Sequence, residues 1–332
     1  DTDRSRGLGD VYKRQILNNV NGFSWDVSAN LSTVANKIVK LPANGNENNR
    51  QGGYQVYDPQ KGEVVWDGGK QEGGKLGDLF AFKQDHIFKD WDDVKANANN
   101  RYDAIGELYG PAAWEALKDK AGKQPIEPGD VCWADLNNDG VINNLDRVKV
   151  GNLFPTVTGG FSTTLGYKDF SLYARFDYAL GHTLYNDLAA RSLGQYQGSF
   201  NIIDMVKDSW SETNQDTDIP KFYYADQLSK KNITRSNNGL TAVDNNSSRF
   251  YEKGDYLALR EITLTWNLPK KWINKALMSN ASVYVTGQNL FYITGYTGVS
   301  PEPAVDTTYG QGLDNGRYPT PKTVLLGLSV TF

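Results

Sequence analysis

The sequence predicts an all-β fold, and within that class a partial transmembrane antiparallel β-barrel of about six strands. Six segments alternate apolar and polar residues with a period of two. Several of these segments run for about 10 residues, the length with which a tilted strand crosses the hydrocarbon core of a bilayer. The links between them are alternately short and long, a pattern typical of outer-membrane barrels.

The predicted strands share one apolar and one polar face. In chain order they are residues 22–40, 156–167, 170–180, 255–268, 281–293 and 322–332. In the segment 170–180, Arg175 and Asp177 lie on the face opposite the apolar residues. A barrel would turn this polar face to its lumen, and a β-sandwich could turn it to solvent, so both architectures remain open at this point.

The connections separate these architectures better than the strands do. Residues 167–170 predict a tight turn, and residues 269–280 predict a short link with apolar residues at helical spacing. The three long links are residues 41–155, 181–254 and 294–321, and we expect short helices at 91–99 and 111–121 in the first of them. If the chain ends on the periplasmic side, every long link is an outer loop.

Bulk composition excludes several classes of protein. The 332 residues carry a net charge of -4, so no basic excess points to a nucleic-acid partner. Mean hydropathy is -0.56, which suits a barrel with alternating faces, and no run of about 18 apolar residues predicts a transmembrane helix. The single cysteine, Cys132, excludes an internal disulfide framework.

The N-terminal stretch differs from the rest of the chain. Residues 1–15 are charged and lack clean periodicity, and no signal peptide is visible. We expect this stretch to be non-native or disordered, and residues 16–332 to form the C-terminal part of the barrel.

One segment of the first long link fits the first half of an EF-hand calcium loop. Gly140 stands at the sixth position, where the chain turns sharply, and the last position is an aspartate where glutamate is usual. The candidate ligands of a structural Ca²⁺ ion are Asp135, Asn137, Asp139, Val141 (through its carbonyl), Asn143 and Asp146. The alternative is an Asx-rich turn without metal.

The remaining candidate residues point to binding and assembly and not to catalysis. His86 and His182 lack zinc spacing, so we interpret them as ordinary loop histidines, and no catalytic constellation is found. Four loop aromatics are candidates for stacking on sugar rings, or else for loop packing: Tyr196, Trp210, Tyr223 and Tyr224. Apolar residues at every second position predict a terminal assembly signal: Val324, Leu326, Leu328, Val330 and Phe332.

Several motifs resemble the SusC-type TonB-dependent transporters of Bacteroidota, and the likeness spans nearly the whole chain from Gly22 to Phe332. The residues that carry it are GDLFAFK at 77–83, PGD at 128–130 with the 135–147 loop, VGN at 150–152, YLALREITL at 256–264 and TGQNLF at 286–291. Cys132-Trp133-Ala134 departs from the family pattern, which usually has charged or tyrosine-containing sequence there.

The resemblance implies a barrel of about 22 strands with a plug, of which only the final strands are in this chain. It implies energised import of glycan or peptide fragments through the bacterial outer membrane, without enzymatic activity. The implied partners are a SusD-like surface lipoprotein over the outer loops, TonB through the missing N-terminal region, the barrel assembly machinery and outer-membrane lipid.

Two other hypotheses compete with this interpretation. A secreted, calcium-stabilised β-sandwich that binds carbohydrate predicts strands of five or six residues and two sheets around a dry core. A sugar-processing hydrolase predicts two carboxyl groups roughly 5–9.5 Å apart in a cleft.

Overall fold

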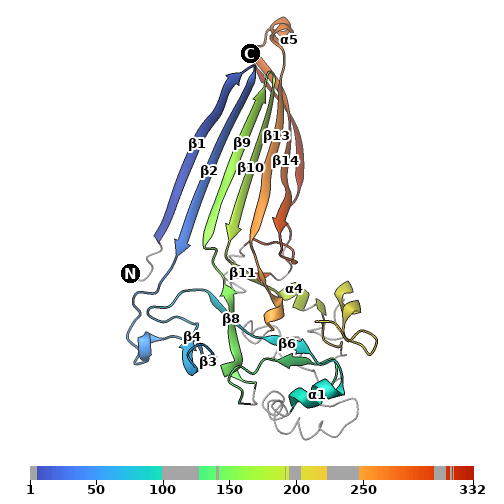
Figure 1. The fold of residues 1–332 in the computed structure, drawn as a ribbon. Coiled ribbons are helices and arrows are strands. Elements are labelled where there is room, and N and C mark those ends of the chain that lie inside the picture. Colours follow the sequence, from blue (N-terminus) through green and yellow to red (C-terminus); the bar gives the residue numbers. More distant parts are fainter. Residues whose placement is uncertain are drawn as a thin grey trace.

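The fold is dominated by one long antiparallel sheet (Figure 1). The computed structural model describes residues 6–98, 127–139, 142–190, 192–193, 203–222, 247–302, 312–314, 316 and 318–332. The sheet has seven strands in the order β1-β2-β9-β10-β13-β14-β16. These are β1 (Arg6–Val20), β2 (Phe23–Ala35), β9 (Val157–Tyr167), β10 (Phe170–Leu180), β13 (Tyr256–Asn267), β14 (Asn280–Thr294) and β16 (Thr323–Thr331).

All six predicted strands are present, and each lies next to its predicted neighbour in the sheet. The prediction of a partial antiparallel barrel wall is confirmed in strand type, length and order. The sandwich alternative is not supported, since the other sheets among the described residues have only two or three strands. No helix in the described part of the chain is long and apolar enough to span a membrane.

Strand β1 was not predicted, because residues 1–15 were set aside. Residues 6–15 form the first part of β1 and pair with β2, so they belong to the sheet. The register sets Arg14 opposite Val27, on the apolar face described next, where a charge fits poorly. The non-native origin of residues 1–15 stays a prediction, and this mismatch is in line with it.

The two faces of the sheet differ in chemistry. One cross-strand row is apolar and joins five strands through Leu165, Leu172, Leu264, Val285 and Leu326. Leu264 is 50% exposed and Leu326 is 77% exposed. Exposed aliphatic side chains on every second residue form a continuous apolar surface, as a lipid-facing sheet requires.

The neighbouring row on the other face is mainly polar. It consists of Thr164, Tyr173, Thr263, Thr286 and Leu325. The Thr263 and Thr286 hydroxyls lie 2.8 Å apart and hydrogen-bond across the strands. Since the side-chain period of a strand is two, the single sheet carries an apolar and a polar surface back to back.

The connections divide between the two ends of the sheet (Figure 1). The links between β1 and β2, β9 and β10, and β13 and β14 all lie at the end where the chain terminates; the last contains α5 (Lys270–Ile273) and the 3-10 turn η7 (Asn274–Ala276). The links that leave β2, β10 and β14 lie at the opposite end, which we call the loop end. This alternation confirms the predicted arrangement of short and long connections.

The long connections contain small elements of their own. In the first these are η1 (Glu47–Asn49), β3 (Tyr54–Asp58), β4 (Glu63–Asp67), β5 (Asp78–Phe82), β6 (Gln84–Ile87), α1 (Trp91–Ala98), β7 (Val131–Trp133), η2 (Asn144–Asp146) and β8 (Arg147–Asn152). In the second and third they are β11 (Thr183–Asn186), α4 (Asp187–Ala190), η4 (Asp204–Asp208), η6 (Ser248–Phe250), β12 (Tyr251–Lys253) and β15 (Leu313–Asp314). The helix expected at 91–99 is α1, and the helix expected at 111–121 lies outside the described residues.

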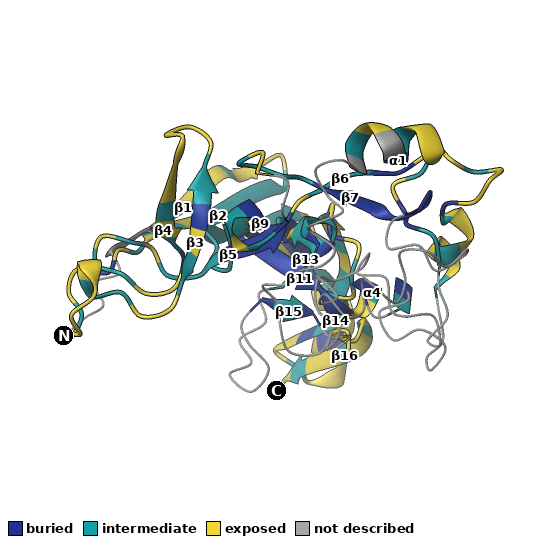
Figure 2. Ribbon diagram, turned by 90° about the horizontal axis from the view of Figure 1, so that it is seen from below, coloured by how far each residue is buried: buried dark blue, intermediate teal, exposed yellow. Residues whose placement is uncertain are grey.

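Buried residues are concentrated in small strands of the long connections, and β7 and β11 are buried throughout (Figure 2). The largest cluster joins the first and second long connections and consists of Phe82, Ile87, Val131, Trp133, Ile142 and Trp210. The hydrophobic core of the described residues therefore lies mainly in the long connections, and within this part of the chain no second layer covers either face of the long sheet.

Candidate functional site

A charged cluster occupies the polar face of the sheet near the loop end. The Arg260 guanidinium donates to both carboxylate oxygens of Asp177, with Nη2 lying 2.9 Å from Oδ2. It also donates to Glu302 and, through Nη1 at 3.0 Å, to the Tyr292 hydroxyl. The Tyr292 hydroxyl in turn donates to Glu302 at 2.6 Å. We call Asp177, Arg260, Tyr292 and Glu302 the polar-face cluster.

An irregularity in β13 explains how Arg260 reaches this face. Arg175 pairs with Glu261 and Phe176 with Leu259, so Arg260 is an extra residue of β13 against β10. Against β14, the single residue Arg260 faces the two residues 289 and 290. An extra residue in a β-bulge lets two successive side chains turn to one face of the sheet. Asn289 has a φ of 51°, a left-handed conformation that asparagine tolerates better than most residues.

The sheet beside the cluster is hollowed. A depression of about 530 Å³ lies against β2, β9 and β10, and Arg260 and Asp177 form part of its wall. Its other polar lining residues are Ser28, Asn30, Ser162 and Arg175. Gly160 pairs with Asn30 and Asp177 on this face, and a Cβ there would lie 2.7 Å from the Phe176 carbonyl oxygen, so glycine is required at this position. The depression has hydroxyl, amide and guanidinium groups of the kind that hydrogen-bond a polar solute.

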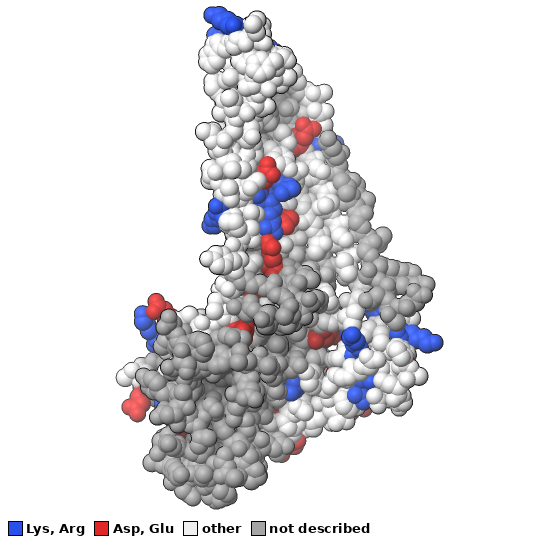
Figure 3. All heavy atoms as spheres, turned by 180° about the vertical axis from the view of Figure 1, so that it is seen from behind, with Lys and Arg blue, Asp and Glu red and all other residues white. Residues whose placement is uncertain are grey.

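Charge on the rest of this surface is sparse. Figure 3 shows a group of basic and acidic side chains midway along the sheet. From this group to the end of the sheet opposite the loop end, the surface is mostly uncharged. Arg175 is exposed and forms no ion pair with a described residue. Arg260, in contrast, forms ion pairs with the carboxylates of Asp177 and Glu302. Arg175 is therefore the guanidinium with free donors facing the depression.

The cluster also fastens the third long connection to the sheet. Glu302 lies beyond the end of β14, and its contact with Arg260 brings it back onto β13. One residue earlier, the Pro301 carbonyl accepts a hydrogen bond from His182 Nε2 at 2.8 Å. His182 is almost fully buried, so this loop histidine has a structural role: it links two long connections.

The predicted calcium loop is a compact turn between β7 and η2. Both Asp146 oxygens accept backbone N–H groups at 2.8 Å, one from Leu136 and one from Asn143. Burial raises the pKa of the Asp146 carboxyl, and the negative charges of Asp135 and Asp139 add to the rise, while the two backbone hydrogen bonds oppose it. The carboxylates of Asp135 and Asp139 thus lie close enough to Asp146 to repel its negative charge. Clustered carboxylates of this kind are the ligands that a hard dication such as Ca²⁺ prefers.

The other predicted ligands of this loop are only partly described. Asn137 Nδ2 donates to Asp139 at 2.7 Å, and the Asn143 side chain accepts from Leu145, so these residues also support an Asx-rich turn. Val141, whose carbonyl was expected to point inward, lies outside the described residues. Calcium at this loop stays a prediction.

Of the four aromatic residues proposed to stack on sugar rings, only Trp210 lies among the described residues. Trp210 is only 8% exposed, its Nε1 donates to the Lys89 carbonyl at 3.2 Å, and it packs in the largest buried cluster. It is therefore a packing residue in this structure, and its proposal as a sugar platform is corrected. Tyr196, Tyr223 and Tyr224 lie outside the described residues.

The predicted terminal signal lies on the apolar face of β16. Val324, Leu326 and Leu328 are between 65% and 77% exposed, and Phe332 is 88% exposed. Val330, the fourth residue of the signal, pairs with Ala281 and is partly covered. The alternating pattern is confirmed, whereas its role in assembly stays a prediction.

Known proteins resemble this chain along nearly its whole length. It is 26% identical to TonB-dependent receptor P3 of Formosa agariphila over 328 residues, which cover 97% of this chain and 28% of the relative. TonB-dependent receptor P26 of the same organism is 32% identical over 217 residues, covering 63% and 20%. TonB-dependent receptor SusC of Bacteroides thetaiotaomicron is 24% identical over 312 residues, covering 93% and 24%.

This chain is similar to TonB-dependent receptors, SusC among them. Its fold matches a chain of the RagAB peptide transporter with a TM-score of 0.65 at 20% identity, covering 99% of this chain and 29% of that one. No protein-family profile matches. The chain spans between 20% and 28% of the length of these curated relatives.

TonB-dependent receptors are outer-membrane proteins, and this relationship explains the two faces of the sheet. The apolar face carrying Leu264 and Leu326 meets lipid, and the opposite face is the inner side of a barrel wall. The relatives are named as receptors and not as enzymes. The polar-face cluster is thus a feature of the inner wall.

Sequence reasoning found only part of this cluster. It singled out Asp177 as a mid-strand charge and missed Arg260, Tyr292 and Glu302. The motif YLALREITL contains Arg260 and the motif TGQNLF ends just before Tyr292, so they marked this region as part of the family resemblance. They gave no reason to place Arg260, Tyr292 and Glu302 next to Asp177.

Proposed function

We propose that this chain forms part of the wall of a SusC-like importer, which takes up glycan or peptide fragments across the outer membrane in a TonB-dependent manner. The observation that carries the proposal is a single long antiparallel sheet with an exposed apolar face and a polar, charge-bearing, hollowed face. A soluble protein would have to cover the apolar face, whereas lipid covers it in a membrane.

The polar face supports passage of hydrophilic cargo. The hydroxyl and amide groups of Ser28, Asn30 and Ser162 suit both sugar hydroxyls and peptide bonds, and Arg175 adds a free cationic donor. This mixture does not by itself choose between the two cargoes. We place glycan fragments first, as the resemblance suggests, and peptide fragments second.

The sheet is part of a larger wall in this proposal. Within the described residues its edge strands are β1 and β16, and the smallest enclosing barrels have about eight strands. The remaining strands, the plug and the TonB-binding region would lie in sequence outside this chain. The loop end would meet a SusD-like surface lipoprotein, and the barrel assembly machinery would insert the strands into outer-membrane lipid.

Uptake by intact cells tests the proposal. Cells with and without the receptor gene are given matched fluorescent oligosaccharides and peptides, with a TonB-deficient strain as the energy control. We expect receptor-dependent, TonB-dependent accumulation of one of these classes. Equal accumulation of both classes in all three strains would overturn the proposal. Accumulation of peptides alone would decide the cargo against our first choice.

We also propose that the loop 135–146 holds a structural calcium ion through Asp135, Asn137, Asp139, Asn143, Asp146 and the carbonyl of Val141. Asp135→Ala and Asp139→Ala should each make the first long connection more sensitive to protease in calcium, because one carboxylate ligand is lost. Chelation should produce the same change in the parent protein and none in the variants. Protease sensitivity that is identical with and without chelator in the parent would identify a metal-free turn.

Phe332 provides a test of the terminal assembly signal. Deletion of Phe332 should reduce the amount of receptor at the cell surface several-fold, because the exposed apolar row of β16 then ends without its aromatic residue. Tyr318→Ala is the matched control, since Tyr318 is also a highly exposed aromatic residue and lies before β16 begins. Quantitative surface labelling measures both, and equal surface levels for deletion and parent would rule out the signal.

A further inference from the structure

Two short strands of the first long connection bring a histidine and the only cysteine of the chain together. In the β6–β7 pair His86 lies directly opposite Cys132, so both side chains project to the same face. Between Gln84 and His86 the register shifts by one, which makes Asp85 an extra residue of β6. Such a bulge turns two successive side chains to one side, and here it sets Asp85 beside His86.

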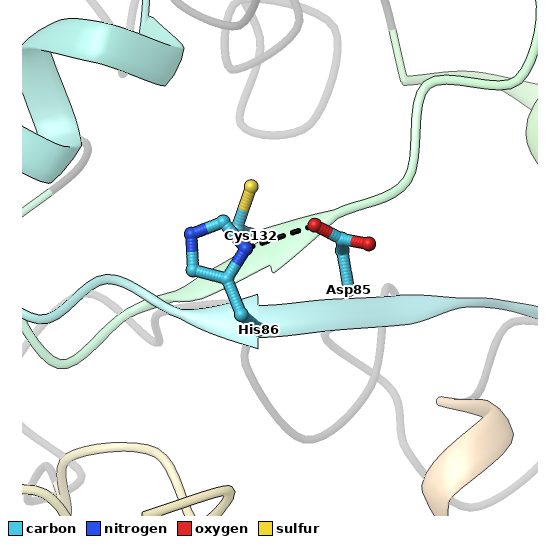
Figure 4. A group of neighbouring side chains, drawn as sticks. All are labelled: Asp85, His86 and Cys132. Carbon is cyan, nitrogen blue, oxygen red and sulfur yellow. Dashed lines mark hydrogen bonds and ion pairs between the residues drawn. The ribbon is translucent and has the colours of Figure 1, made fainter. Parts of the chain in front are cut away.

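The three side chains converge on one point (Figure 4). Asp85 Oδ2 lies 2.9 Å from His86 Nδ1, and one ligand atom of each of the three residues lies within 4.8 Å of the other two. Around a tetrahedral zinc ion with bonds of about 2.0–2.3 Å, ligand atoms are separated by roughly 3–4 Å. The Asp85 side chain is 53% exposed, so a modest rotation of it can shorten the separation of the ligand atoms from at most 4.8 Å to the distance that zinc requires.

The second ring nitrogen of His86 has a separate carboxylate. His86 Nε2 lies 3.3 Å from Asp93 Oδ1. Asp93 is itself held in the first turn of α1, where it accepts from the Lys89 amide at 2.9 Å and from Asn97 Nδ2 at 2.7 Å. Both ring nitrogens of His86 thus have a carboxylate acceptor. When the Nδ1 proton is released, Asp93 still accepts Nε2–H, and the lone pair on Nδ1 becomes available to a metal ion.

We propose that Asp85, His86 Nδ1 and Cys132 bind a zinc ion, with Asp93 as a positioning residue and a water molecule in the fourth position. Thiolate and imidazole ligands favour zinc over calcium or magnesium, which prefer oxygen alone. On binding, the Cys132 thiol releases its proton to solvent and the sulfur bonds to the metal. Cys132 is 1% exposed, so protein shields the metal–sulfur bond, and the exposed Asp85 side marks the entry path.

The metal would order the loop end of the molecule. Strands β6 and β7 are joined by only three residue pairs, and they support the buried cluster around Ile87, Val131 and Trp133. A zinc ion bridging the two strands, and linked through His86 to Asp93 on α1, ties three elements together. This site is separate from the calcium loop, which begins three residues after Cys132 and uses oxygen ligands.

Cobalt substitution tests the site directly, since a cysteine–cobalt bond gives a thiolate charge-transfer band in the near ultraviolet. The full-length protein in detergent, stripped of metal, is titrated with Co²⁺ and then with Zn²⁺ as competitor. We expect a saturable band that zinc abolishes. Cys132→Ser should remove the band, and His86→Ala should weaken Co²⁺ binding by at least about ten-fold. A parent protein without the band, or a band retained in Cys132→Ser, would overturn the proposal.

Two further variants separate metal binding from folding. Asp93→Asn should keep the band but lower zinc affinity by about 10–100-fold, because the amide is a weaker acceptor for Nε2–H. Asp92→Asn, which changes the neighbouring acid on α1, should leave zinc affinity unchanged. The protease pattern of each metal-free variant verifies the fold. Equal losses in Asp93→Asn and Asp92→Asn would contradict the positioning role.

Discussion

An arginine at position 326 should destabilise the membrane-inserted sheet, whereas the same arginine at position 325 should be tolerated. Leu326 is 77% exposed on the apolar face, and Leu325 is 46% exposed on the opposite face. A charge facing the middle of the bilayer costs roughly 2–4 kcal/mol in a transmembrane strand, and a charge facing a wet lumen costs little. The two substitutions are matched in residue type, strand and depth.

Resistance to denaturation measures this difference. Outer-membrane barrels can be followed by the change in gel mobility between folded and unfolded forms, as urea is raised. Leu326→Arg should unfold at clearly lower urea than the parent, and Leu325→Arg should stay within about 1 kcal/mol of it. Equal destabilisation by both substitutions would mean that both faces are dry, and the transmembrane interpretation would then fail.

Removing the Arg260 side chain should detach the third long connection from the sheet. Arg260→Ala leaves the Asp177 and Glu302 carboxylates close together without their shared cation. Hydrogen bonds between charged partners are worth about 1.5–3 kcal/mol each, but both carboxylates are more than a third exposed, so solvent screens part of the loss. We expect a net cost of roughly 1–3 kcal/mol.

Hydrogen exchange over residues 294–302 measures this detachment. Exchange should accelerate several-fold in Arg260→Ala and less in Arg260→Lys, because lysine keeps the charge but not the two-pronged contact with Asp177. Arg175→Ala is the control, since Arg175 lies on the same face without an ion pair to a described residue. Unchanged exchange in Arg260→Ala would show that Pro301 and its neighbours are held by other contacts.

The polar-face cluster joins the depression in the sheet to the third long connection. Asp177 and Arg260 line the depression, while Glu302 belongs to a connection at the loop end. One guanidinium therefore contacts both the sheet and the third long connection. We expect uptake by Arg260→Ala cells to fall while surface levels stay near those of the parent, which the uptake assay and surface labelling measure together.

The main sheet could be predicted from the sequence because its signal is local. The alternation in residues 170–180 and 322–332 repeats every two residues, so it specifies strand type and the two faces without knowledge of any partner. The short turn after Tyr167 and the helical spacing around Trp272 identified the short links in the same way. Strand β1 was missed because its residues 6–15 carry charges where an apolar face was expected.

Local patterns failed wherever side chains from distant segments meet. Trp210 looked like an exposed aromatic, and only packing against Phe82 and Trp133 buries it. His86 and His182 looked alike in sequence, yet His182 holds the Pro301 carbonyl and His86 faces two carboxylates and Cys132. Nothing in the spacing of these residues encodes those partners.

By itself the sequence determined an all-β chain of long, two-faced strands joined by alternating short and long links, because the two-residue period and the turn signals are properties of neighbouring residues. Tertiary structure alone decided that Arg260 meets Asp177 and Glu302, and that His86 meets Cys132. Both meetings depend on one-residue shifts in strand register, at Arg260 in β13 and at Asp85 in β6. A bulge changes which side chains share a face, and it forms only when the paired strands come together.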